Sequence, residues 1–136
     1  MARAGVEPVV LTVDFHTPDS ERARLTEAAL DSMPADVDAV FATDDLTAAA
    51  VLEWARKRGH RVPEEFKVVG FDATAAMRRA LPGLTTIQQP IDDLALCAVD
   101  VLLGQIDARA EGVEPHEAES HSPAPLPIRL LTGITT

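Results

Sequence analysis

Four carboxylate side chains directly follow short apolar segments of this sequence, and this placement predicts a binding site for a polar ligand. Asp14 follows the first segment, Asp44 and Asp45 follow the second, and Asp72 follows the third. If these segments are parallel strands, their carboxyl ends meet at one edge of a sheet, where such sheets commonly bind ligands. Carboxylates accept hydrogen bonds and therefore suit a sugar or nucleoside, and Phe15 can stack on its apolar face.

A second interpretation is that each aspartate caps the helix after its own strand. A carboxylate at a helix N-terminus accepts hydrogen bonds from backbone N–H groups that have no partner within the helix. For Asp45 alone, the two interpretations are about equally well supported. Capping does not require all of these acids to share one edge, so the four together favour a binding site.

Other chemistries have weaker support. His116 and His121 are five residues apart, about 140° around a helix, whereas zinc helices place their histidines four apart. The sequence contains no serine-hydrolase elbow and no phosphate-binding glycine pattern. Cys97 lies beside an apolar helical stripe, where a buried, inert thiol is expected. We therefore expect no catalytic residues, no metal and no cofactor.

Composition and charge exclude further classes. The 136 residues include 12 Lys and Arg against 22 Asp and Glu, which gives a net charge of −10. Duplex DNA binding needs clustered cations, so direct nucleic-acid binding is not expected. No apolar run approaches the roughly 18 residues of a membrane span, and no signal peptide is recognisable. We expect a cytoplasmic protein with no membrane association.

The segments that would position the acids alternate between strands and helices. This alternation predicts an α/β fold with a parallel sheet. A proline-bearing acidic stretch at 110–125 is predicted to be a surface loop or linker. The predicted strands cover residues 9–13, 38–43, 66–71, 84–87 and 126–132, and the predicted helices cover residues 20–33, 46–58, 73–81 and 91–106.

Four motifs occur in order along the middle of the chain. They are AVFATDDLTA at 39–48, RVPEE at 61–65, VVGFD at 68–72 and LTTIQQP at 84–90. Together they resemble the effector-binding region of LacI/GalR-type transcriptional regulators. Residues 9–30 match more weakly, and residues 126–130 resemble the last strand of the family, although Gly133 replaces an arginine that is often found there.

The resemblance implies an incomplete, Rossmann-like lobe of a periplasmic-binding-protein-like fold (type I). Residues 1–86 would form the C-terminal lobe, and 87–109 a helix that normally packs on the first lobe. Residues 110–125 would be a linker and 126–136 a returning strand. We expect the family's helix-turn-helix, its hinge helix and its first lobe to have no counterpart among these residues.

The resemblance also implies roles for individual residues. Phe15 matches the aromatic side chain that stacks on the effector, and Gln89 matches a glutamine that borders the pocket. Asp44 and Asp45 match an Asn-Asp pair that binds ligand hydroxyls, and Asp72 matches the acid after Val-Gly-Phe that does the same. Asp44 departs from the usual asparagine. An ionised aspartate only accepts hydrogen bonds, so two adjacent carboxylates favour a ligand rich in donors or leave one of the two acids protonated.

The function implied is effector sensing in a LacI-type regulator, with a sugar or nucleoside-like effector and no enzymatic activity. The alternative is a solute-binding fragment of a sugar transporter. The helix after Pro90 has an apolar stripe that would lack the first lobe as its partner. Because such a stripe is costly to expose, we expect a homodimer, possibly domain-swapped. The stripe consists of Ile91, Leu94, Ala95, Ala98, Val101, Leu102 and Ile106.

Overall fold

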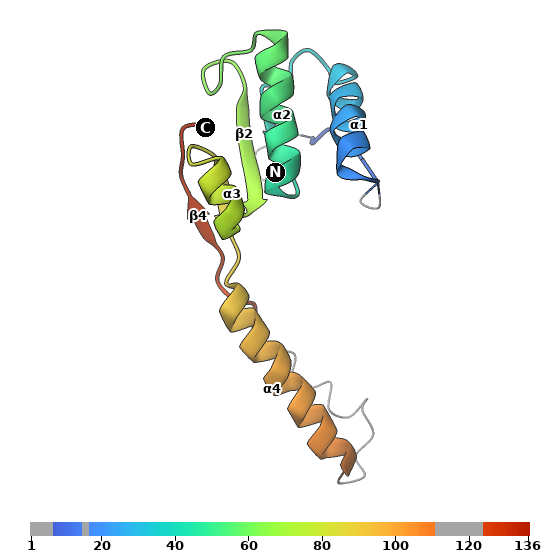
Figure 1. Ribbon diagram of the computed structural model, residues 1–136, viewed down its shortest axis with the longest axis vertical. Coiled ribbons are helices and arrows are strands. Elements are labelled where there is room, and N and C mark those ends of the chain that lie inside the picture. The colour runs from blue at the N-terminus through green and yellow to red at the C-terminus, as the bar shows by residue number, and fades with distance from the viewer. Residues whose placement is uncertain (1–6, 15–16, 111–123) are drawn as a thin grey trace. The chain divides into compact units, whose positions relative to one another are not determined.

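The computed structural model describes residues 7–14, 17–110 and 124–136. These residues form two compact units: a sheet unit, Met1–Gln88 with Leu130–Thr136, and an α4 unit, Gln89–Arg129. The elements in chain order are α1 (Asp19–Asp31), β1 (Ala39–Phe41), α2 (Asp45–Arg58), β2 (Lys67–Asp72), α3 (Ala75–Ala80), β3 (Thr85–Gln88), α4 (Ile91–Ala110) and β4 (Arg129–Leu131) (Figure 1).

The four strands form one sheet in the order β1-β2-β3-β4. The first two pairs are parallel, with Val40 opposite Val68 and Gly70 opposite Thr86. A helix connects the strands of each of these pairs, α2 between β1 and β2 and α3 between β2 and β3. The predicted α/β class with a parallel sheet is therefore confirmed.

The core of the sheet unit lies between α2 and the sheet. Ala48, Val51 and Ala55 of α2 recur at helical spacing and are almost completely buried. Val68 of β2 and Phe66, which precedes it, complete the centre of this core. In Figure 1, α2 lies beside β2 and α1 lies beside α2.

A polar network joins α1 to α2 at the border of this core. Trp54 donates its indole N–H to the Asp31 Oδ1 atom at 2.8 Å, and Arg58 forms a salt bridge with the same carboxylate. These donors stabilise the ionised form, so the Trp54 hydrogen bond first, and then Arg58, lower the pKa of Asp31 below its ordinary value of 3.8. Lys57 pairs with Glu27 across the same two helices.

The ends of α2 follow local sequence rules. Asp44 caps the N-terminus, because its Oδ1 atom accepts a hydrogen bond from the Thr47 N–H at 2.7 Å. Gly59 ends the helix in the left-handed conformation, with φ of 79°. The capping interpretation is therefore confirmed for Asp44.

The C-terminal segment is hydrogen-bonded to β2 and β3. The Thr135 hydroxyl donates to the Val68 carbonyl at 2.6 Å and accepts from the Thr85 N–H at 3.0 Å. The Gly133 N–H donates to the Thr85 Oγ1 atom at 2.9 Å. These contacts fix the residues after β4 to the start of β3 and to β2, so the sheet unit is built from two separate stretches of chain.

Two sequence-based predictions in the sheet unit are corrected. Residues 9–13 form no strand, and the Val10 side chain there is 78% exposed. A β-branched run becomes a strand only where a neighbouring strand pairs with it and packing buries one face. The helix predicted from residue 73 begins at Ala75, because Asp72 and Ala73 have positive φ values of 103° and 51°, which a helix does not allow.

The α4 unit contains the predicted long helix, which extends to Ala110. No residue of α4 is buried. No helix among the described residues is long and apolar enough to cross a membrane. Most of the predicted 110–125 linker lies outside the described residues. The large apolar side chains exposed on α4 are Ile91, Leu94, Leu96, Val99, Val101, Leu102, Leu103 and Ile106.

Candidate functional site

The carboxyl ends of β1 and β2 lie at the same edge of the sheet. The two strands are parallel, and Phe41 at the end of β1 is opposite Val69 of β2. Asp44 and Asp45 follow β1 at the start of α2, and Asp72 is the last residue of β2. We refer to this edge as the carboxylate rim.

Asp45 is the most enclosed of these acids, with only 2% of its surface exposed. Its Oδ1 atom accepts a hydrogen bond from the Thr86 hydroxyl at 2.5 Å, and its Oδ2 atom accepts one from the Ala73 N–H at 2.9 Å. Asp45 therefore joins the start of α2 to β3 and to the turn that follows β2. This position is possible because residue 70 is glycine: a Cβ atom there would lie 2.3 Å from the Asp45 Oδ1 atom.

Asp44 is half-buried, and both of its carboxylate oxygens contact Thr47. Oδ1 accepts from the Thr47 N–H, and Oδ2 accepts from the Thr47 hydroxyl at 2.9 Å. A carboxylate has about four acceptor positions. The capping contacts occupy two of them, so further acceptor positions remain for a donor in solution.

Asp72, the last residue of β2, and Ala73 form a strained turn at the end of this strand. Both have positive φ, which is uncommon for residues other than glycine and costs about 1–3 kcal/mol for each residue. Ala73 is 4% exposed, and its N–H donates to Asp45. A hydrogen bond to a charged group contributes about 1.5–3 kcal/mol, which is comparable with the strain of one residue. The structure thus brings Asp45 and the Asp72 turn together.

The remaining predicted residues are placed differently. Asp14 is exposed and does not end a strand, so the strand-end argument fails for it. Phe15 lies outside the described residues. Gln89 is half-buried and belongs to the α4 unit, whereas Asp44 and Asp72 belong to the sheet unit.

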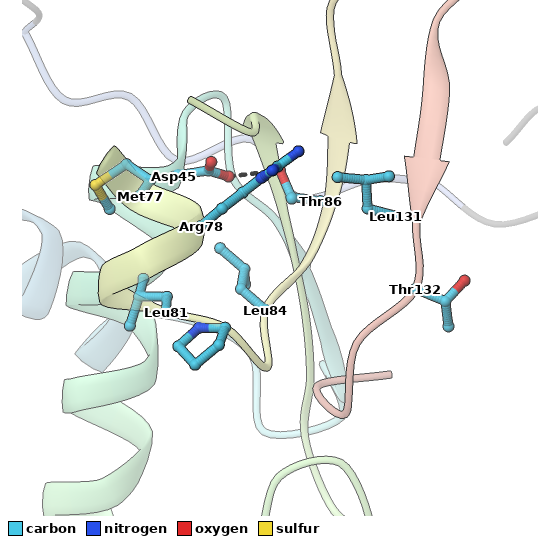
Figure 2. A pocket seen from close by; sticks show the side chains of 9 residues that line it. Asp45, Met77, Arg78, Leu81, Leu84, Thr86, Leu131 and Thr132 are labelled. Carbon is cyan, nitrogen blue, oxygen red and sulfur yellow. Dashed lines mark hydrogen bonds between the residues drawn. The ribbon is translucent and has the colours of Figure 1, made fainter. Parts of the chain in front are cut away.

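A cavity of about 240 Å³ adjoins the buried side of the rim, between α3 and the strands. In Figure 2, the Arg78 side chain extends from α3 toward Thr86, next to the hydrogen bond between Asp45 and Thr86. The lining contains both apolar and polar side chains, and most of it was not predicted from the sequence. The lining residues are Asp45, Met77, Arg78, Leu81, Pro82, Leu84, Thr86, Leu131 and Thr132.

Sequence reasoning missed Thr86 as a partner of Asp45. Thr86 is 3% exposed although it carries a hydroxyl, and buried hydroxyls are normally hydrogen-bonded. The only sequence feature that singles out Thr86 is its position in the LTTIQQP motif. This motif does not indicate that Asp45 is the partner of the Thr86 hydroxyl. The backbone N–H of Ala73 has no sequence signal at all.

Metal ligation has no support in the described part of the chain. No group of three or more His, Cys, Asp or Glu side chains there could hold a metal ion. The histidine pair at 116 and 121 lies outside the described residues. Cys97 is half-buried on α4.

Comparison with known proteins gives consistent matches. The family described as periplasmic binding protein-like domain matches residues 1–130. The ribose operon repressor of Halalkalibacterium halodurans is 34% identical over 104 residues, which cover 76% of this chain and 30% of the repressor. The chain therefore spans less than a third of the length of this curated relative.

Two solved structures have the same fold and a bound sugar. A LacI family regulator from Enterococcus faecium with bound ribose has a TM-score of 0.64 at 26% identity, covering 93% of this chain and 42% of that one. A LacI family regulator from Arthrobacter sp. FB24 in complex with lactose has a TM-score of 0.63 at 29% identity, covering 84% of this chain and 40% of that one.

Proposed function

Because the chain belongs to the periplasmic binding protein-like domain family and is an effector-binding part of a LacI-type regulator, we propose that its carboxylate rim forms one wall of a sugar-binding pocket. The observation that carries the proposal is the shared edge of β1 and β2, where Asp44 and Asp72 follow parallel strands. The ribose and lactose complexes of similar regulators support a sugar as the ligand class.

The roles proposed for individual residues follow from their chemistry. Asp44 and Asp72 accept hydrogen bonds from ligand hydroxyls, because carboxylates are strong acceptors. Phe15 stacks on the apolar face of the sugar ring, and Gln89 is the glutamine that borders the pocket. An ionised Asp44 only accepts hydrogen bonds, so a ligand that presents donors on that side fits it.

The proposed domain organisation assigns the sheet unit to the C-terminal lobe and α4 to the part that packs on a first lobe. The division between the two units at Gln88 and Gln89 lies close to the predicted boundary at residue 86 and supports this assignment. In a complete regulator, a ligand that binds two closed lobes more tightly than two open ones would shift the protein between DNA-binding states. That regulator would act in the cytoplasm without enzymatic activity.

Isothermal titration calorimetry tests the proposed pocket. The natural gene product and this 136-residue chain are each titrated with ribose and with lactose. We expect saturable binding of one sugar by the natural product and a dissociation constant raised about 10- to 100-fold in Asp72→Ala. Asp31→Asn is the matched control, because Asp31 lies on α1 and contacts Trp54 and Arg58. Absence of binding to both sugars and to a nucleoside panel would contradict the proposal.

We also propose that α4 mediates self-association. Its large apolar side chains are exposed, for example Leu96 at 66% and Leu102 at 56%, and contiguous apolar surface of this kind marks interaction sites. Sedimentation velocity of this chain at micromolar concentration should show a dimer, and Leu102→Glu should convert it to a monomer. A native chain that sediments as a monomer would contradict this proposal.

A further inference from the structure

We infer that Asp45 is a positioning residue: it holds the Asp72–Ala73 turn in place and does not contact the ligand itself. The inference rests on the proposed function for its relevance to sugar binding. Its structural part, the control of the turn by Asp45, stands on the geometry alone.

Burial and hydrogen bonding separate Asp45 from its neighbour Asp44. Asp45 is 2% exposed, and each of its oxygens accepts a hydrogen bond from within the chain. Asp44 is half-buried at the surface of the same helix end. A ligand at the rim can therefore reach Asp44, whereas Asp45 lies behind it between α2 and the sheet.

The contact with Ala73 acts on the conformation of the turn. Ala73 has φ of 51° and Asp72 has φ of 103°, so the chain reverses through two residues in an uncommon conformation. The Ala73 N–H points to the Asp45 Oδ2 atom. Without this acceptor, the buried N–H would lose its partner and the turn could relax to a conformation with negative φ. The direction of the Asp72 side chain would then change.

The hydrogen bond between Asp45 and Thr86 also attaches Asp45 to strand β3. Thr86 is in the middle of β3, opposite Gly70 of β2, and is 3% exposed. Its hydroxyl donates to the Asp45 Oδ1 atom. Asp45 therefore fixes the turn relative to both α2 and the sheet. Asp44 caps the same helix. Asp45 therefore holds Asp44 and Asp72 in a fixed position relative to each other.

Two substitutions distinguish positioning from direct contact. Asp45→Ala removes both acceptors. Asp45→Asn keeps the shape, because the carboxamide oxygen can accept from Ala73 while the NH2 group donates to the Thr86 hydroxyl, which can also accept. If Asp45 acts by positioning, the Asp45→Asn variant should keep the conformation of the Asp72–Ala73 turn. A direct contact between a carboxylate and ligand donors predicts that asparagine weakens binding.

The first measurement needs no ligand. Amide hydrogen exchange is followed by NMR in this chain, and the rate at Ala73 is divided by the rate at Val68. For Asp45→Ala we expect this ratio to rise about tenfold or more, and for Asp45→Asn less than about threefold. Asp31→Asn, a carboxylate substitution on α1, should leave the ratio unchanged. An unchanged ratio in Asp45→Ala would overturn the inference.

A second variant covers the case in which Asp45→Ala does not fold. Thr86→Val removes the donor to the Asp45 Oδ1 atom but keeps the volume of the side chain. We expect a smaller rise of the Ala73 ratio, together with a change in the HN–Hα coupling of Asp72. A ratio and a coupling that both match the native chain would overturn the inference.

The second measurement links the turn to the ligand. In the natural gene product, the dissociation constant for ribose or lactose is measured for Asp45→Ala, Asp72→Ala and the double variant. If Asp45 acts through Asp72, the double variant binds no more weakly than Asp72→Ala. Losses that add would show a direct contact and overturn the inference. If neither sugar binds, the proposed function fails, while the exchange ratio still decides whether Asp45 controls the turn.

Discussion

Replacement of Gly133 by alanine should detach the C-terminal segment from the sheet unit. A Cβ atom at residue 133 would lie 2.1 Å from the Gly83 carbonyl oxygen, 2.6 Å from its carbonyl carbon and 2.7 Å from the Leu84 carbonyl carbon. All three atoms belong to the backbone, so no side-chain rotation relieves the clash. The chain around residue 83 or residue 133 must move.

The expected loss of stability can be worked from the contacts that such a movement breaks. The Gly133 N–H donates to Thr85, and the Ile134 N–H donates to the Gly83 carbonyl at 2.8 Å. Each hydrogen bond contributes about 1 kcal/mol net, and overpacking adds about 1–3 kcal/mol. We therefore expect the free energy of unfolding to fall by about 3–5 kcal/mol. Gly133→Arg, which restores the residue common in the family, should be at least as destabilising.

Urea unfolding monitored by Trp54 fluorescence measures this loss, because Trp54 is the single tryptophan and is buried in the sheet unit. With a slope of about 1.5 kcal/mol per molar urea, the midpoint should fall by about 2–3 M. Gly104→Ala is the matched control, since nothing lies within 4 Å of a Cβ atom there. A Gly133→Ala midpoint equal to that of the control would refute the reasoning.

Three further predictions concern the sheet unit. Asp44→Ala should lower the free energy of unfolding by about 1 kcal/mol, whereas Asp44→Asn, which still caps, should be nearly neutral in urea unfolding. Phe66→Ala should cost about 3–5 kcal/mol in the same assay because Phe66 is 2% exposed. The pKa of Asp31 is lower in the folded chain than the ordinary value of 3.8. The stabilisation by the ionised carboxylate is therefore complete above pH 3.8 and is lost as the pH falls through the pKa of the folded state. Asp31→Asn should remove that part of the acid dependence in urea midpoints measured between pH 2.5 and 6, and an unchanged profile would contradict this.

The ends of α2 could be predicted from the sequence because their causes are local. A helix N-cap and a left-handed C-terminal glycine depend on residues within one turn, and Asp44 caps α2 as the capping interpretation predicts. The strand ending at Asp72 was found because apolar β-branched residues precede it. Its continuation as helix from residue 73 was wrong, since positive φ at Asp72 and Ala73 depends on tertiary contacts.

The function of Asp45 could not be predicted because its partners are distant in sequence. Ala73 is 28 residues away and Thr86 is 41 residues away, and no local pattern indicates either contact. The same limit explains the error at residues 9–13. Strand propensity describes a preference for a half-buried, paired surface, and whether a neighbouring strand is available is a property of the whole fold.

The two-part construction of the sheet unit has a consequence for its synthesis on the ribosome. Val68 donates its N–H to the Thr135 carbonyl and accepts from the Thr135 hydroxyl, and these residues are 67 positions apart. At roughly 5–20 residues per second, the ribosome needs about 3 to 13 s to proceed from one to the other. Within that time, from the synthesis of β3 until the synthesis of β4, the nascent sheet has an unpaired edge at β3, and other chains can pair with such an edge. Slow codons between residues 89 and 129 would lengthen this interval and increase the requirement for chaperones.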